Sequence, residues 1–205
     1  MGTLILGDFL NRWFAVIGHR AQSSGVLSLN DLPGSGGRMD VLARAVNSAL
    51  FLSHAIRENS HVILHLLGGD GPTRRIWFDG SRIRGVRPDE RSISGHIKAV
   101  IKDPIPPVDR FIEYSEGVYH SGGGLVQTLT EWRSKGVVPV VLDADGEHHS
   151  RIPMDSDVGF ILSDDRPLSS TEEVSLEGEI RVAIGEKWLQ GHSCISVTHY
   201  LMDEN

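Results

Sequence analysis

The residues VVPVVL at Val137–Leu142 and VGFIL at Val158–Leu162 are nearly all apolar. Short runs of this kind are typical of strands that are buried on both faces, as in parallel sheets covered by helices. Pro139 is an exception within the first run, because proline cannot donate to a strand ladder and is confined to edges and bulges. These two segments indicate an α/β fold.

Working outward from them, the rest of the chain alternates strands with helices. Further strands are predicted at Trp13–Gly18, His61–Leu67 and Ile180–Ile184. We expect helices from the glycines at 34–37 to about 57–60, over 88–102, from 125 to about 135, and over 187–202, with a hairpin at 75–86 around Asp79-Gly80. This order predicts a mostly parallel sheet with helices on both faces. Residues 1–12 read as an N-terminal extension and 13–205 as a single domain.

Composition and length fit one globular domain. The chain has 205 residues, of which 40% are hydrophobic and 23% charged, enough to bury a core without covalent cross-links. Cys194 is the only cysteine, which excludes an intramolecular disulfide and favours an intracellular, cytoplasmic location. The N-terminus lacks the features of a signal peptide, and no run is long enough to span a membrane.

The decamer DLPGSGGRMD at Asp31–Asp40 is the least ordinary stretch of the chain. Its three glycines precede a helical pattern, so their backbone N–H groups could bind an anion beside Arg38. The alternative is a tight turn that leads into a buried helix, which is commoner for a lone glycine-rich loop. A P-loop, a Rossmann loop and an α/β-hydrolase elbow are all excluded, because their motifs are absent.

Charge is unevenly distributed along the chain. The total is −7, but residues 74–102 carry eight basic against three acidic side chains, and residues 143–179 carry eleven acidic against two basic ones. A segregated basic stretch can bind phosphates in spite of an acidic total. A solvated face of the predicted hairpin explains the same pattern equally well.

A small-molecule pocket is expected where the late strands end. In open α/β sheets ligands bind beyond the carboxyl ends of the strands, which here are Leu142, Ser163 and Ile184. No metal site is predicted, since His61 and His65 read as core histidines and residues 143–146 as a turn. Cys194 reads as a small packing residue of the last helix rather than a nucleophile.

Several motifs together resemble one known family. The chain is similar, in the same order from about residue 13 to 203, to the archaeal tRNA pseudouridine N1-methyltransferases of the SPOUT superfamily. The motifs that carry the resemblance are DLPGSGGRMD at 31–40, VNSALFLSH at 46–54, PDERS at 88–92, FILSD at 160–164 and HSCISVTHYLMD at 192–203.

The resemblance implies a knotted α/β homodimer with a C-terminal trefoil knot that binds S-adenosylmethionine. It places at the cofactor Leu142, Ser163, Ile184, Gly185, Glu186, Lys187, Trp188, Leu189 and Cys194. The implied substrate is pseudouridine 54 in the T-loop of tRNA. We expect Arg38 and Arg91 to contact phosphate or base carbonyl groups, and Asp40 or Asp89 to accept the N1 proton. Two alternatives stay open: the same reaction on another RNA such as rRNA, and a non-catalytic module that binds cofactor or RNA.

Overall fold

A computed structural model describes residues 10–108 and 110–204, so most of the predicted extension at 1–12 lies outside the described residues. One eight-stranded sheet has the order β4-β5-β3-β2-β1-β7-β6-β8. The strands are β1 (Arg12–Gln22), β2 (Ser60–Gly68), β3 (Arg74–Asp79), β4 (Ile112–Ser115), β5 (Val118–Gly122), β6 (Val138–His148), β7 (Val158–Ser163) and β8 (Ile180–Ala183). The helices are α1 (Met39–Leu50), α2 (Glu90–Val100), α3 (Leu125–Ser134), α4 (Ser170–Ser175) and α5 (Gly191–Asp203), with a 3-10 turn at His149–Arg151.

The predicted α/β class and mostly parallel sheet are confirmed. β1 pairs in parallel with β2 and β7, and β6 pairs in parallel with β7 and β8. The other half of the sheet, β2-β3-β5-β4, is antiparallel. Pro139 pairs with Gly159 of β7 on one side, and pairing with β8 begins only at Val140. Its missing N–H therefore leaves no gap in the ladder.

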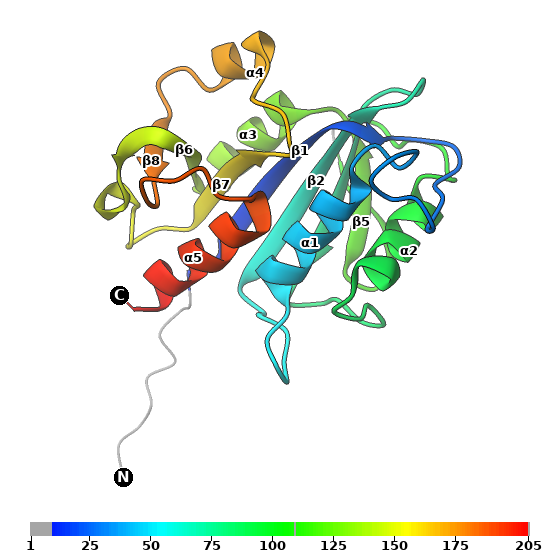
Figure 1. Ribbon diagram of the computed structural model, residues 1–205, viewed down its shortest axis with the longest axis horizontal. Coiled ribbons are helices and arrows are strands. Elements are labelled where there is room, and N and C mark those ends of the chain that lie inside the picture. Colours follow the sequence, from blue (N-terminus) through cyan, green and yellow to red (C-terminus); the bar gives the residue numbers. More distant parts are fainter. Residues whose placement is uncertain (1–9, 109, 205) are drawn as a thin grey trace.

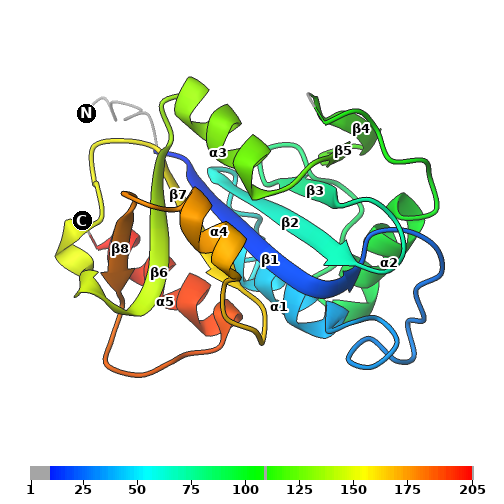
Figure 2. The ribbon, with the colours of Figure 1, turned by 90° about the horizontal axis from the view of Figure 1, so that it is seen from above.

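Helices cover both faces of the sheet (Figures 1 and 2). α1, α2 and α5 lie on one face, and α3 and α4 lie on the other. The sheet has two hydrophobic cores, one on each face, and β1 contributes to both. Its residues Phe14 and Val16 belong to one core, whereas Trp13, Ala15 and Ile17 belong to the other. Successive side chains of a strand point to opposite faces, so a strand covered on both needs apolar residues at every position.

The hairpin predicted at 75–86 is wrong. Only β3 forms, and it pairs with β2 and β5. Asp79 Oδ1 accepts hydrogen bonds from the backbone N–H and hydroxyl of Ser81, and Gly80 N donates to Ser60 O at 3.0 Å. The turn is thus hydrogen-bonded to the start of β2, and the chain after it leaves the sheet instead of forming a second strand paired with β3.

Other boundaries also differ from expectation, and α4 and β4 were not anticipated. β1 continues to Gln22 instead of ending at Gly18. α1 ends at Leu50, because Phe51 and Ile56 form an antiparallel bridge and Arg57 N donates to Leu50 O. α5 begins at Gly191 rather than at Lys187. β6 continues through the predicted turn at 143–146 as a bulge, where a Cβ on Gly146 would lie 2.7 Å from Val182 N.

Among the described residues, no helix is long and apolar enough to cross a membrane.

Candidate active site

A cavity of about 280 Å³ lies at the carboxyl ends of β7 and β8 and at the bulge of β6 that follows Leu142, beside the N-terminus of α5. Its lining includes eight of the nine residues expected at a cofactor, namely Leu142, Ser163, Ile184, Gly185, Lys187, Trp188, Leu189 and Cys194. Glu186 is exposed and does not line it. The folded chain therefore brings together the three segments that the sequence singled out, although β6 does not end at Leu142 as expected but continues to His148.

The cavity has an apolar floor and a polar rim. Leu162 and Val182 are buried beneath it, and Trp188 stands at its edge with 76% of its surface exposed. Gly191 allows α5 to approach closely, since a Cβ there would meet Leu162 Cδ1 at 3.1 Å. The α5 N-cap, Gln190, makes no side-chain capping bond. An apolar hollow with a few polar groups at its edge suits an organic ligand of nucleoside size.

Cys194 belongs to the wall of this cavity. Burial raises the pKa of the Cys194 thiol, and its Sγ lies 3.7 Å from Leu189 O. A nucleophilic cysteine requires the opposite shift, toward the thiolate. The structure supports the packing role expected for this residue.

The glycine-rich decamer folds as a tight turn, the second of the two interpretations that the sequence left open, and its backbone N–H groups are bonded within the loop. Asp31 accepts hydrogen bonds from Gly34 N and Ser35 N, and the N–H groups of residues 36–39 bind carbonyls of the same loop. Gly37 has φ of 65°, and a Cβ there would lie 1.9 Å from Arg20 O. The bare backbone of this loop allows close approach of the end of β1, not of a ligand.

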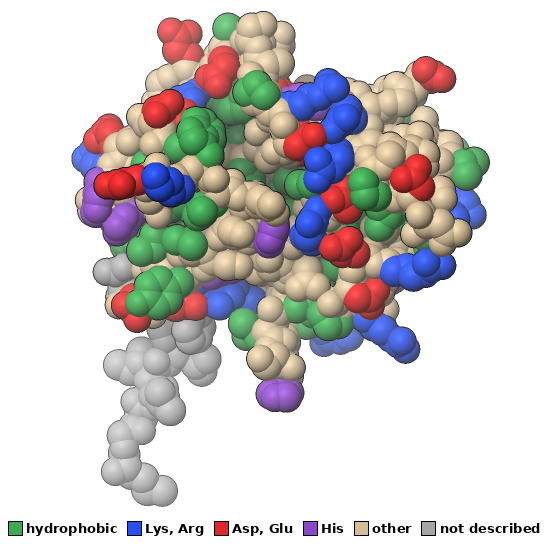
Figure 3. All heavy atoms as spheres, viewed as in Figure 1, with side chains coloured by type: hydrophobic (Ala, Val, Ile, Leu, Met, Phe, Trp, Pro, Cys, Tyr) green, Lys and Arg blue, Asp and Glu red, His purple; other side chains and the backbone are tan. Residues whose placement is uncertain are grey.

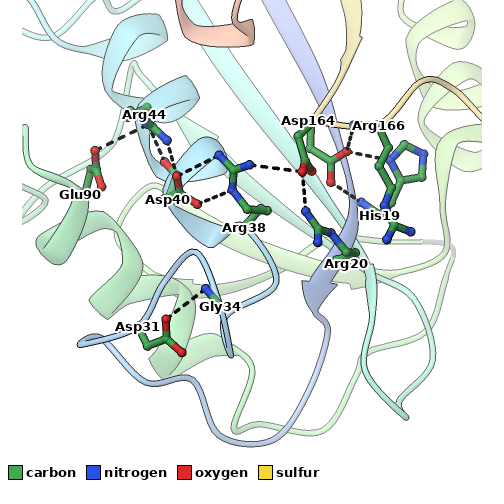
Figure 4. A network of polar contacts seen from close by, with 11 residues as sticks. His19, Arg20, Asp31, Gly34, Arg38, Asp40, Arg44, Glu90, Asp164 and Arg166 are labelled. Carbon is green, nitrogen blue, oxygen red and sulfur yellow. Dashed lines mark hydrogen bonds and ion pairs between the residues drawn. The ribbon is translucent and has the colours of Figure 1, made fainter.

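Arg38 ends this loop and starts a network of ion pairs (Figure 4). Its φ is 67°, and its guanidinium donates to Asp40 Oδ1 at 3.0 Å and to Asp165 Oδ2 at 3.2 Å. Asp40 also binds Arg44, which lies 3.6 Å from Glu90 at the start of α2. Asp165 lines the cavity, so the network joins the decamer to the pocket.

Asp40 is buried within this network. Burial acts to raise the pKa of Asp40, but the hydrogen bond and charge of Arg38, with the charge of Arg44, outweigh it and lower the pKa. The carboxylate is therefore ionised at neutral pH and holds Arg38 in place. Arg20, which also binds Asp165, was not anticipated, because nothing in the sequence near it forms a motif.

Asp89 and Arg91 lie outside the cavity lining. Asp89 is the N-cap of α2, where its carboxylate accepts a 2.7 Å hydrogen bond from Ser92 N. Arg91 is exposed and donates to Asn30 Oδ1 at 3.3 Å, which ties α2 to the loop before the decamer. Among the four predicted reaction residues, the structure joins Arg38 and Asp40 to the pocket edge through Asp165, and it places Asp89 and Arg91 on the neighbouring helix.

A second polar cluster missed by the sequence fixes the pocket wall after β7. His19 Nδ1 lies 2.9 Å from Asp164 Oδ1, and its Nε2 lies 3.0 Å from Glu172 Oε2 on α4. Burial would lower the pKa of His19, but hydrogen bonds to the two carboxylates outweigh burial and raise it. His19 thus ties β1 to the loop that carries Asp164 and Asp165. Only the folded chain brings these residues together, since Asp164 is 145 residues away from His19.

Only some of the basic side chains in the stretch 74–102 are exposed at the surface. Arg74 and Arg75 are fully buried; Arg74 binds the carbonyls of Val100 and Asp103, and Arg75 binds Glu131. The exposed cations of the stretch include Arg84, Arg87 and Arg91. On the face covered by α1 and α2, basic side chains lie side by side with acidic ones (Figure 3). The described residues contain no group of three or more His, Cys, Asp or Glu arranged to hold a metal ion.

Comparisons with known proteins agree with this arrangement. A family model described as "Putative SAM-dependent RNA methyltransferase" matches residues 11–205. Three proteins named tRNA (pseudouridine(54)-N(1))-methyltransferase are similar to the chain: those of Methanocella arvoryzae (37% identity; 94% of this chain, 98% of the relative), Haloarcula marismortui (38%; 94% and 96%) and Methanospirillum hungatei (42%; 78% and 79%).

Among solved structures, Archaeoglobus fulgidus Nep1 bound to S-adenosylhomocysteine has a similar fold. The TM-score is 0.68 at 12% identity, and the match covers 95% of this chain and 98% of Nep1. At this identity the likeness concerns the fold alone.

Proposed function

The chain belongs to the archaeal tRNA pseudouridine N1-methyltransferase family, and from that premise we propose that it transfers a methyl group from S-adenosylmethionine to N1 of pseudouridine 54 in the T-loop of tRNA. The observation that carries the proposal is the cavity formed by the bulge of β6 and the ends of β7 and β8, with Arg38 joined to its edge through Asp165. The relatives' names supply the substrate, and the geometry supplies a place for the cofactor next to cationic side chains.

The cavity fits the cofactor's chemistry. An adenine ring needs apolar contacts, which Leu142, Leu162 and Ile184 offer, and the polar ends of the molecule need donors and acceptors at a rim. When bound, S-adenosylmethionine supplies an electrophilic methyl group. We assign its binding to the lining residues, including Ser163, Gly185, Lys187, Trp188, Leu189 and Cys194, with Glu186 beside the rim.

The chain's own side chains must hold the RNA and remove one proton. A base stacked in a folded loop has to be extruded to reach a pocket, and flanking phosphates need cations. Arg38 and Arg91 contact phosphate or base carbonyl groups in this proposal. Asp40 or Asp89 accepts the N1 proton. Asp40 is favoured over Asp89 by its link to the pocket edge through Arg38 and Asp165.

Methyl transfer to a tRNA transcript containing pseudouridine tests the proposal. We expect calorimetry to detect S-adenosylmethionine binding, and mass analysis to locate one added methyl group at N1 of pseudouridine 54. At saturating cofactor, replacing the true proton acceptor by Asn should lower kcat about 10²–10⁴-fold. Asp40→Asn and Asp89→Asn form a matched pair, since each removes one negative charge.

Each outcome of this experiment has a definite reading. Full activity in both variants contradicts proton transfer to a carboxylate at these positions. Methylation of rRNA in place of tRNA supports the alternative substrate. A chain that does not bind S-adenosylmethionine is the non-catalytic module.

We also propose that the chain forms a homodimer with a C-terminal trefoil knot and acts in the cytoplasm. The family resemblance supports the knot, and a tRNA substrate supports the location. The N-terminal half of α5 carries small residues at Gly191, Ser193 and Ser196, which allow close helix approach, while Tyr200 is 60% exposed. We expect light scattering at micromolar concentration to give twice the chain mass of 22.5 kDa. A monomer mass would contradict the dimer.

A further inference from the structure

Two guanidinium groups share one carboxylate at the edge of the pocket. Arg20 near the end of β1 and Arg38 at the start of α1 both donate to Asp165 Oδ2. The three side chains are each between 29% and 39% exposed. Solvent and ligands can therefore reach this ion-pair cluster.

Other parts of the protein fix the side chain of Arg38 and the backbone of Arg20. Asp40 binds Arg38 through two nitrogens, and Asp40 is held in turn by Arg44. The backbone of Arg20 is fixed by close contact with Gly37 and Gly68, where an added Cβ would meet Arg20 O at 1.9 Å and 2.2 Å. Removal of Asp165 would thus leave the guanidinium of Arg38, which Asp40 orients, and that of Arg20 beside it facing one anion-sized position.

The bond between Asp165 and the arginines is exchangeable. Exposed ion pairs are individually weak, because water and salt screen them. A phosphodiester offers its oxygens to both guanidinium groups, and planar guanidinium groups bind such oxygens with well-defined geometry. A phosphate of a bound RNA can therefore replace Asp165 at little energetic cost.

We propose that Arg20 and Arg38 form a phosphate-binding pair for the RNA substrate, and that Asp165 masks this pair in the free protein. The inference rests on the proposed function and adds Arg20 as a contact and Asp165 as an internal competitor. Because Asp165 also lines the cavity, exchange of the carboxylate for an RNA phosphate releases one side chain of the pocket wall when the substrate arrives.

Affinity for the tRNA transcript, measured without cofactor, tests the masking. Asp165→Asn should bind the transcript about threefold more tightly than the wild type, the scale of one exposed ion pair. Glu147→Gln is the matched control, because it removes the same charge from an exposed pair with Arg151 outside the pocket. We expect Glu147→Gln to change the affinity by much less.

Arg20→Ala identifies the group that is masked. This variant should weaken binding and reduce the slope of log affinity against log salt concentration by about 0.7–0.9, the loss of one phosphate contact. Arg20→Ala should also cost more affinity in the Asp165→Asn background than in the wild type. A double-mutant cycle measures this difference directly.

The outcomes separate this inference from the proposed function. If Asp165→Asn binds RNA no more tightly than Glu147→Gln, or if Arg20→Ala costs the same in both backgrounds, masking is refuted while the methyltransferase proposal stands. If the wild type binds no tRNA, both fail. Thermal unfolding confirms that each variant is folded.

Discussion

Gly37→Ala is expected to lower the free energy of unfolding by about 3–5 kcal/mol, the range of the most damaging single substitutions. A Cβ on Gly37 would lie 1.9 Å from Arg20 O and 2.5 Å from Arg20 C, so the backbone of β1 or of the decamer must move. The φ of 65° adds strain of about 1–2 kcal/mol for any residue with a Cβ. Urea unfolding measures the loss.

Gly85→Ala is the matched control for this substitution. Gly85 has a similar φ of 73°, but a Cβ there would meet nothing within 4 Å. We expect only the backbone strain of about 1–2 kcal/mol. Equal losses in the two variants would show that the contact between the decamer and Arg20 does not limit stability.

The second large effect is loss of stability at acidic pH. His65 is fully buried with Nε2 3.3 Å from Thr128 Oγ1, and burial, with the charge of Arg75, lowers its pKa to about 3. His199 places Nε2 3.0 Å from Ala49 O and Nδ1 3.1 Å from Arg12 Nη1. Burial and the charges of Arg57 and Arg12 lower its pKa to about 3 as well.

The sign follows from proton binding. Below the ordinary pKa of 6.5 the unfolded chain takes up protons on both histidines, and the folded chain does so only near pH 3. Stability is therefore present above 6.5 and is lost as the pH falls. Between about pH 7 and about pH 5 each histidine should contribute a loss of about 2 kcal/mol.

His65→Gln and His199→Gln isolate this contribution, because each removes one titrating ring and leaves the carboxylates in place. We expect each variant to be less stable than the wild type near neutral pH and to lose less stability on acidification. Urea unfolding at several pH values gives the slopes. Identical slopes in the wild type and both variants would show that these rings do not control acid stability.

Much of the fold follows from local sequence pattern. β1, β2, β7 and β8 each contain a short, mainly apolar run from which the strand was predicted, and α3 follows the glycines at 122–124 as predicted. Turn chemistry was less reliable: Asp79-Gly80 suggested a hairpin, but the turn is fastened to Ser60, whose position depends on the register of β2. The short elements β4 and α4 carry too little periodicity to be recognised.

The candidate site was likewise predicted in part from the local sequence pattern. Leu142, Ser163 and Ile184 come at the ends of apolar runs of the sequence, and the parallel strands β6, β7 and β8 bring these three positions together. The sequence therefore predicted the pocket, although β6 itself continues to His148. The role of the decamer could not be read locally. Whether bare backbone faces a ligand or the protein depends on what packs against it, and here Arg20 O does.

The sequence by itself determined the α/β class, the strands that line the pocket and, through its motifs, the family. Only the tertiary structure decided how charges are paired: it joined Arg38 to Asp40 and Asp165, added Arg20 and His19 to the pocket edge, and buried Arg74 and Arg75. The physical reason is the separation along the sequence between the residues that interact. Hydrophobic periodicity is a property of neighbouring residues, whereas an ion pair depends on a few ångströms between side chains far apart in the chain, 145 residues for Arg20 and Asp165.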